Sequence, residues 1–265
     1  MSPAKPSQSR YHKLIEKVFF DGYEAGSTEI YFSRSALKEA AEKLNIEIPE
    51  NLGDVIYSIR FRTPMPDSVI ATQPSGVEWI IELVGRSKYR FRLAKINRIL
   101  PNPHLAVIRI PNNTPEIITS YALDDEQALL AKIRYNRLID IFLGLTTFSL
   151  QNHLRTTVKG MGQIEIDEMY VGIDKHGCHY VIPVQAKGGT DQISIVQTTQ
   201  DTKWCAQRYP SLRCRAISAQ FVTNDLIALF ELKVEDDELK VVEERHYKLV
   251  PAGELDSKEV VAYRS

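Results

Sequence analysis

The sequence predicts a mixed α/β (α+β) protein with two domains, residues 1–122 and 123–265. In the first half, two short amphipathic helices precede two strand-like runs, whereas in the second half a long helix precedes a β-hairpin, another helix and further strands. A stretch rich in proline and asparagine, residues 100–122, separates the two patterns and is therefore the expected boundary. The chain has 265 residues, of which 43% are hydrophobic and 25% charged, which suits a folded two-domain protein.

The charge distribution indicates where a phosphate-containing partner would bind, and the cysteine content indicates the cellular compartment. The formal net charge is -1, but residues 1–122 hold 16 Lys and Arg against 13 Asp and Glu, while the remainder holds 17 against 21. Any contact with phosphates is therefore expected in the first half. Three cysteines without a C-x-x-C pair argue against a disulfide framework or a zinc site and favour the reducing cytoplasm. We find no signal-peptide pattern and no apolar run of membrane-spanning length, so no membrane partner is expected.

The first half contains two helix patterns in succession. Segment 35–44 has apolar residues at the i, i+3, i+4, i+7 spacing of one helix face, with Ser35 as the N-cap candidate. After a break that contains Pro49, segment 51–62 repeats this spacing. Two amphipathic helices across a short turn predict a helix-turn-helix. The polar side chains expected on or just beyond the exposed face of the second helix include those of Tyr57, Arg60 and Arg62.

Two strand-like runs follow, at residues 77–84 and 88–96. In the second run, cations alternate with apolar residues, which places three of them on one strand face: Lys88, Arg90 and Arg92. A helix-turn-helix followed by a basic hairpin is the layout of a winged helix, and a cationic strand face can lie along a phosphate backbone. We therefore expect these cations, with the exposed face of the second helix, to bind DNA. A strand face that is merely solvated would show the same alternation.

The second half predicts the order α-β-β-α-β with additional strands. A long helix is expected from Asp124 to Gly144, where glycine ends the pattern. A hairpin is expected at 162–189, and a second helix ends before Pro210. Further strands are expected at 105–110, 214–222, 224–232 and 239–250.

Four polar residues interrupt the apolar alternation of the hairpin. If the turn centres on His176, residues whose numbers add up to 352 face each other. Asp167 then lies opposite Gln185, and Glu165 lies opposite Lys187. All four numbers are odd, so all four side chains point to one face of the sheet. The expected catalytic group is therefore two acids, an amide and a lysine.

This combination of side chains suits hydrolysis of a phosphodiester bond. Oxygen atoms of Asp167 and Gln185 can hold Mg²⁺, a hard cation that prefers oxygen ligands, and Lys187 can orient the attacking water and offset charge on the phosphate. An amide is a weaker ligand than a carboxylate, so we expect a further acid to complete the site. The candidates are Glu165, which is preferred, Glu168, which would need a β-bulge, and Glu126 on the preceding helix. The alternative is a simple cross-strand ion pair with ordinary polar neighbours.

Asp167 stands eighteen positions before the run Gln185-Ala186-Lys187, and predicted helices flank the two strands. Over residues 124–230, this pattern resembles the PD-(D/E)xK nuclease superfamily, in which an Asp on one strand is followed by (D/E)-x-K on the next. Glutamine replaces the middle acid, as in Mrr-like members, and Ile166 replaces the proline. The resemblance implies an αβββαβ core and a Mg²⁺-dependent nuclease.

Segment 51–62 is similar to DNA-binding segments of some type II restriction endonucleases. That resemblance implies cleavage of specific sites in double-stranded DNA, a homodimer that cuts both strands, and a cognate DNA methyltransferase encoded nearby. Other interpretations stay open: a Mrr-like nuclease that requires modified DNA, a winged-helix DNA-binding regulator with an inactive nuclease fold, or an interaction protein whose hairpin acids are surface residues.

Overall fold

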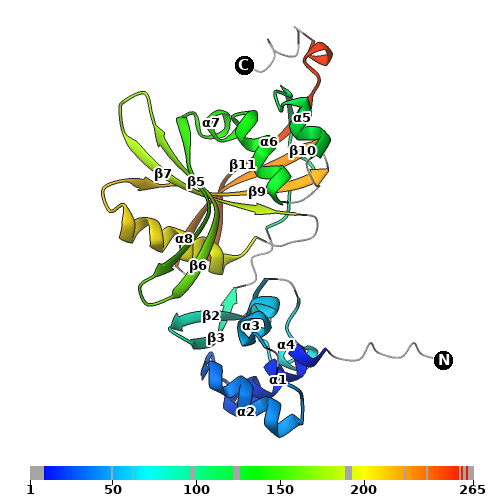
Figure 1. The fold of residues 1–265 in the computed structure, drawn as a ribbon, viewed down its shortest axis with the longest axis vertical. Coiled ribbons are helices and arrows are strands. Elements are labelled where there is room, and N and C mark those ends of the chain that lie inside the picture. Colours follow the sequence, from blue (N-terminus) through cyan, green and yellow to red (C-terminus); the bar gives the residue numbers. More distant parts are fainter. Residues whose placement is uncertain are drawn as a thin grey trace, which may run out of the picture. The chain divides into compact units, whose positions relative to one another are not determined.

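The computed structural model describes residues 9–48, 50–61, 63–95, 99–121, 126–188, 193–223, 225–236, 238–256, 258 and 261. It contains both helices and sheets, in agreement with the predicted mixed class (Figure 1). The chain forms two compact units. The first comprises residues 1–97 with 157–162, and the second comprises residues 98–156 with 163–265.

The first unit combines four helices and a three-stranded sheet among its described residues. In chain order these are α1 (Arg10–Gly22), β1 (Glu29–Ser33), α2 (Arg34–Leu44), α3 (Leu52–Phe61), α4 (Asp67–Ile70), β2 (Val77–Gly85) and β3 (Lys88–Lys95). The strands are antiparallel in the order β1-β3-β2. The two helices and two strands predicted between residues 35 and 96 are therefore confirmed as α2, α3, β2 and β3.

One face of this sheet packs against the helices. Tyr89 and Phe91 of β3 are buried, as are Trp79 and Ile81 of β2. Phe19 of α1 lies edge-on to Trp79 and to Phe91, with ring centroids 5.1 and 5.2 Å away, an arrangement that aromatic pairs favour. The predicted alternation along β3 is confirmed, because its apolar residues form the core and its cations lie on the other face.

The second unit is built on one large sheet. Its elements are β4 (Val107–Pro111), α5 (Glu116–Tyr121), α6 (Glu126–Tyr135), α7 (Leu138–Leu143), β5 (Thr146–Val158), β6 (Gly162–Ile173), β7 (His179–Lys187), α8 (Ile195–Arg208), β8 (Arg213–Cys214), β9 (Ala216–Thr223), β10 (Leu226–Glu235), β11 (Glu238–Val250) and the short 3-10 helix Ala252–Glu254. The strand order is β4-β11-β10-β9-β7-β6-β5, with β8 beside β7. β6 and β7 are antiparallel, whereas β7 and β9 are parallel and joined through α8.

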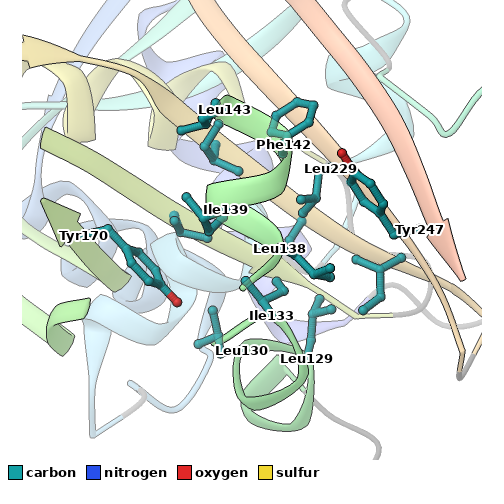
Figure 2. Close-up of a cluster of buried hydrophobic side chains, with 14 of the residues drawn as sticks. Leu129, Leu130, Ile133, Leu138, Ile139, Phe142, Leu143, Tyr170, Leu229 and Tyr247 are labelled. Carbon is teal, nitrogen blue, oxygen red and sulfur yellow. The ribbon is translucent and has the colours of Figure 1, made fainter. Parts of the chain in front are cut away.

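The two faces of this sheet are covered by different helices (Figure 1). Even-numbered residues of β6 and β7, such as Tyr170, Val184 and Ala186, belong to the core that includes α6 and α7. Figure 2 shows part of this core, with Tyr170 at the edge of the labelled residues. Odd-numbered residues of these strands point to the face on which α8 packs, because side chains alternate along a strand.

The boundary between the units differs from the expected one. β4 pairs in parallel with β11, from His246↔Val107 to Val250↔Pro111, and Ile110 is buried in the core of the second unit. The stretch that was expected to separate two domains therefore belongs to the second unit, which begins at residue 98 rather than near residue 122.

The long helix expected to end at Gly144 is broken into α6 and α7. Arg137, between them, has a left-handed backbone conformation with φ of 51°. The buried side chain of Asn136 accepts a hydrogen bond from the backbone N–H of Asn113 at 2.6 Å and donates one to Thr114 Oγ1 at 2.9 Å. These contacts with a distant loop explain why the helix breaks although its apolar spacing continues.

Two further features were not expected from the sequence. β5 and α5 correspond to no predicted element, and β5 is exposed along most of its length. Asp124, the expected start of the long helix, lies outside the described residues. None of the helices in the described part of the chain is long and apolar enough to cross a membrane.

Candidate active site

The hairpin formed by β6 and β7 has the predicted register. Its pairs run from Glu168↔Val184 to Ile173↔His179, and the two numbers of each pair add up to 352. In the turn, the carboxylate of Asp174 accepts hydrogen bonds from the backbone N–H groups of His176 at 2.8 Å and Cys178 at 2.9 Å. The predicted register is therefore confirmed for these pairs, which end one residue before the predicted pair Asp167 and Gln185.

Side chains take over the hydrogen bonding where this pairing ends. Asp167 Oδ2 accepts a hydrogen bond from the backbone N–H of Ala186 at 2.8 Å. The amide nitrogen of Gln185 donates to the backbone carbonyl of Glu165 at 3.1 Å. Each of the two candidate residues thus ties its own strand to the backbone of the other strand, which fixes the position of both side chains.

Helix α8 adds an acid that sequence reasoning missed, Asp201. The amide nitrogen of Gln185 also donates to Asp201 Oδ2, at 2.8 Å. Asp201 is only 2% exposed, and this burial, reinforced by the charge of Asp167, raises its pKa to about 8 even though the bond from Gln185 lowers it. One signal was present in the sequence: Asp201 shares a helix face with Trp204 and Cys205, at i+3 and i+4, so it occupies a position that faces the core.

Asp167, Gln185, Lys187 and Asp201 form what we call the polar cluster. Burial raises the pKa of Asp167, while the bond from the Ala186 N–H and the charge of Lys187 lower it. Lys187 also lowers the pKa of Asp201, so its ammonium group acts on both acids. Gln185 and Lys187 are buried side chains on β7, opposite Ser218 and Gln220 of β9.

The polar cluster is closely packed under α8. A space of only about 10 Å³ remains beside Gln185, Lys187, Asp201 and Ser218, about the size of one water molecule. Asp167 is half-buried, and Glu165, two residues before it, has a side chain that is 41% exposed. The cluster therefore meets solvent on the side of Asp167.

The three acids considered from the sequence have other partners. Glu165 contacts β5, where its carboxylate lies 3.5 Å from His153 Nδ1 and accepts from Arg155 Nε at 3.3 Å. The charge of Glu165 raises the pKa of Asp167, so Glu165 lies near the cluster. It pairs with His153 and Arg155, however, and not with Lys187 as predicted. Glu168 is fully buried and accepts from Arg134 Nε of α6 at 2.9 Å, so no bulge turns it toward Asp167.

The third acid, Glu126, is the first residue of α6 and is half-buried. Because α6 packs on the sheet face opposite α8, its helix approaches the sheet from the side away from Gln185 and Asp201. The acid that meets Gln185 directly is therefore Asp201.

The donor set of the cluster limits the metal that it can hold. Among the described residues, no three or more His, Cys, Asp or Glu side chains are grouped to hold a metal ion. Asp167 and Asp201 supply two carboxylates, and burial raises the pKa of both, so a cation between them would favour their ionised forms. Mg²⁺ is commonly bound by one or two carboxylates together with water and substrate phosphates, and Asp167 and Asp201 are the two carboxylates that the cluster supplies.

The expected DNA-binding strand face of the first unit is largely neutralised. Arg90 donates to Glu29 Oε1 at 2.6 Å and to Glu82 Oε2 at 2.5 Å, and Arg92 donates to Glu82 Oε1 at 2.9 Å. Arg90 and Arg92 are therefore paired with acids in this structure, and their contact with phosphates stays a prediction. Lys88 is exposed and forms no ion pair with another described residue.

The expected contacts on α3 are only partly available. Tyr57 is exposed. Arg60 was expected to be exposed too, but its guanidinium is buried, and this burial lowers its pKa to about 10. Arg62 lies outside the described residues.

Comparison of the chain with protein-family models, with curated proteins and with solved structures found no match.

Proposed function

We propose that the protein is a metal-dependent endonuclease that hydrolyses phosphodiester bonds of double-stranded DNA. The observation that carries this proposal is the polar cluster, in which β6, β7 and α8 bring two carboxylates, an amide and an ammonium group together where the pairing of β6 with β7 ends. The element order of the second unit also supports it, since α7-β5-β6-β7-α8-β8-β9 follows, apart from the two-residue strand β8, the αβββαβ order of the nuclease superfamily that the sequence resembles.

Each member of the cluster has a separate role in this proposal. Asp167 and Asp201 would hold Mg²⁺, which supplies polarisation of the phosphate when it is bound. The amide nitrogen of Gln185 bonds to Asp201, so we assign this nitrogen to positioning that acid, while the amide oxygen stays the expected metal ligand. Lys187 orients the attacking water and offsets negative charge that develops on the phosphate.

In this proposal, the first unit binds the DNA. Its order α1-β1-α2-α3-α4-β2-β3, with strands arranged β1-β3-β2, supports a winged-helix-like domain. Tyr57 on α3 is exposed, and so are Arg86 and Lys88 at the turn between β2 and β3. These residues replace Arg60 among the proposed contacts. A type II restriction activity extends the proposal to a homodimer, which cuts both strands, and to a cognate DNA methyltransferase.

The test compares variants of Asp201 and Glu165, the two acids considered as the second carboxylate of the site, with a variant of Lys187. Supercoiled plasmid is incubated with Mg²⁺ and wild-type protein, Asp201→Asn, Lys187→Ala or Glu165→Gln. Loss of a metal ligand or of charge stabilisation typically reduces the rate by 10² to 10⁴, so Asp201→Asn and Lys187→Ala should each lose at least about a hundredfold, while Glu165→Gln should stay within a few-fold of wild type.

Two outcomes would contradict the proposal in different ways. If Glu165→Gln were inactive and Asp201→Asn active, the second acid would be the one expected from the sequence. If wild-type protein bound DNA without cutting methylated or unmethylated plasmid, a DNA-binding regulator with an inactive nuclease fold would be the better interpretation.

A further inference from the structure

A second site lies in the second unit, on the sheet face opposite the polar cluster. It is a pocket of about 260 Å³ between α6, α7, β5 and β6. Its lining residues are Ile133, Arg134, Arg137, Ile139, Asp140, Thr147, Phe148, Ser149 and Tyr170. The break between α6 and α7, where Arg137 takes its left-handed conformation, forms one side of this pocket. The pocket therefore depends on the break in a helix that the sequence predicted to be continuous.

The walls of the pocket combine flat apolar surfaces with hydrogen-bonding groups. Ile133, Ile139 and the ring of Tyr170 are buried beneath it. Phe148, on the edge strand β5, is 60% exposed although it is a large aromatic side chain. An exposed aromatic ring at the mouth of a pocket is a surface on which a planar ligand can stack.

The charges around the pocket cancel in pairs. Arg134 donates to Glu168 at 2.9 Å, and Arg137 donates to Asp140 at 2.7 Å. Two guanidinium groups therefore face two carboxylates, which favours a neutral ligand over a free anion or cation. Each guanidinium keeps further N–H groups, since arginine has five, and these can donate to carbonyl oxygens of a ligand.

Two buried polar groups lie close together beside the pocket. The hydroxyl of Tyr170 interacts with Glu168 and Arg134, but within the described part of the chain neither this hydroxyl nor Glu168 Oε2 makes a hydrogen bond of ordinary geometry. Both residues are on the same face of β6, and Glu168 is held in place by Arg134 and by Ser149 Oγ, which donates to its other oxygen at 2.6 Å. Buried polar groups without well-formed hydrogen bonds are costly, and a ligand with donor and acceptor groups along one edge would improve the hydrogen bonding of both.

From these features we infer that the pocket binds a nucleobase. A nucleobase is neutral and planar, carries donors and acceptors on its edges, and is smaller than the ligands that fill pockets of about 300 to 1,000 Å³. The choice of a nucleobase among flat heterocycles rests on the proposed function in DNA cleavage. The base belongs either to a free nucleoside or to a nucleotide turned out of the DNA stack, a form that proteins read by stacking and edge hydrogen bonds.

The first experiment titrates adenosine, guanosine, cytidine and thymidine separately into the full-length protein in EDTA, by calorimetry. Phe148→Ala removes the stacking ring. Leu150→Ala is the matched control, because Leu150 is 50% exposed on the same strand but does not line the pocket. Tyr170→Phe removes only the hydroxyl. We expect at least one nucleoside to bind wild type and Leu150→Ala alike, and Phe148→Ala to weaken it about 5- to 150-fold, the usual range for base stacking.

The second experiment separates the two sources of the base. Lys187→Ala protein, which cannot cut in the proposed mechanism, is mixed with duplex DNA that carries 2-aminopurine, whose fluorescence rises when it leaves the stack. A rise that Phe148→Ala abolishes and Leu150→Ala keeps identifies a base of DNA, whereas nucleoside binding without such a rise identifies a free nucleoside. Either result supports the inference.

The inference is overturned if no nucleoside binds and the fluorescence does not change, or if Phe148→Ala and Leu150→Ala behave alike in both experiments. Its failure is distinct from failure of the proposed function, because the titrations require neither Mg²⁺ nor cleavage. Wild-type plasmid cleavage without nucleobase binding removes only the pocket assignment, and nucleobase binding without plasmid cleavage removes only the nuclease assignment.

Discussion

At the scale of single residues, Asp201 decides the chemistry of the polar cluster. Its carboxyl is buried against the amide of Gln185 and close to the charge of Asp167. This environment disfavours the ionised form, which is why its pKa rises to about 8. Without a cation, the acid is therefore protonated across much of the range in which a nuclease would work.

Removal of this acid should change how stability depends on pH. The unfolded acid has a pKa near 3.9, so between about pH 4 and pH 8 the folded state binds a proton that the unfolded state has lost. The contribution to stability is complete below pH 4 and disappears as the pH rises through about 8. In EDTA, we expect the melting temperature of the wild type to fall from pH 5 to pH 9 more steeply than that of Asp201→Asn. Circular dichroism melts would test this, and parallel profiles would show that Asp201 does not titrate as described.

At the scale of elements, Glu82 joins strands of the first unit. It accepts from Arg90 and Arg92 of β3, and Arg90 also reaches Glu29 of β1. Burial alone would raise the pKa of Glu82, but the hydrogen bonds from these guanidiniums lower it overall. The alternating sequence of β3 predicted which face the cations occupy. It could not predict the partner Glu29, because Glu29 lies on β1, which corresponds to no predicted strand, and strand order is set by tertiary packing.

Glu82→Gln should therefore destabilise the protein without acting on DNA directly. Two half-buried guanidiniums would lose their charged acceptor, at a cost of about 1 to 3 kcal/mol. Lys88→Ala is the matched control on the same sheet face, and as an exposed substitution it should stay within about 0.5 kcal/mol of wild type. Urea unfolding measures both. Lys88→Ala should instead lower the slope of log DNA affinity against log salt by about one, and equal stability of the two variants would contradict this division of roles.

At the scale of the whole molecule, local patterns predicted more than long-range ones. The hairpin register followed from alternation and one turn, both of which are local. Local patterns did not predict that Asp201 lies beside Gln185, because Asp201 reaches this position only when α8 folds back over the sheet. The domain boundary failed for the same reason, since the proline- and asparagine-rich stretch looks like a linker until β4 pairs with β11, more than a hundred residues later in the chain.

This last difference leads to a prediction about fragments of the chain. A fragment of residues 98–265 keeps β4, its parallel pairing with β11 and the buried side chain of Ile110. A fragment of residues 123–265, cut at the boundary that the sequence indicated, loses this strand and the hydrogen bond that the Asn113 N–H donates to Asn136 between α6 and α7. Exposing the edge of β11 and part of the core should lower the unfolding free energy by at least about 2 kcal/mol and promote aggregation through the open strand edge. Urea unfolding and light scattering of the two fragments test this, and equal stability would mean that β4 contributes little to the sheet and that the second unit begins after it.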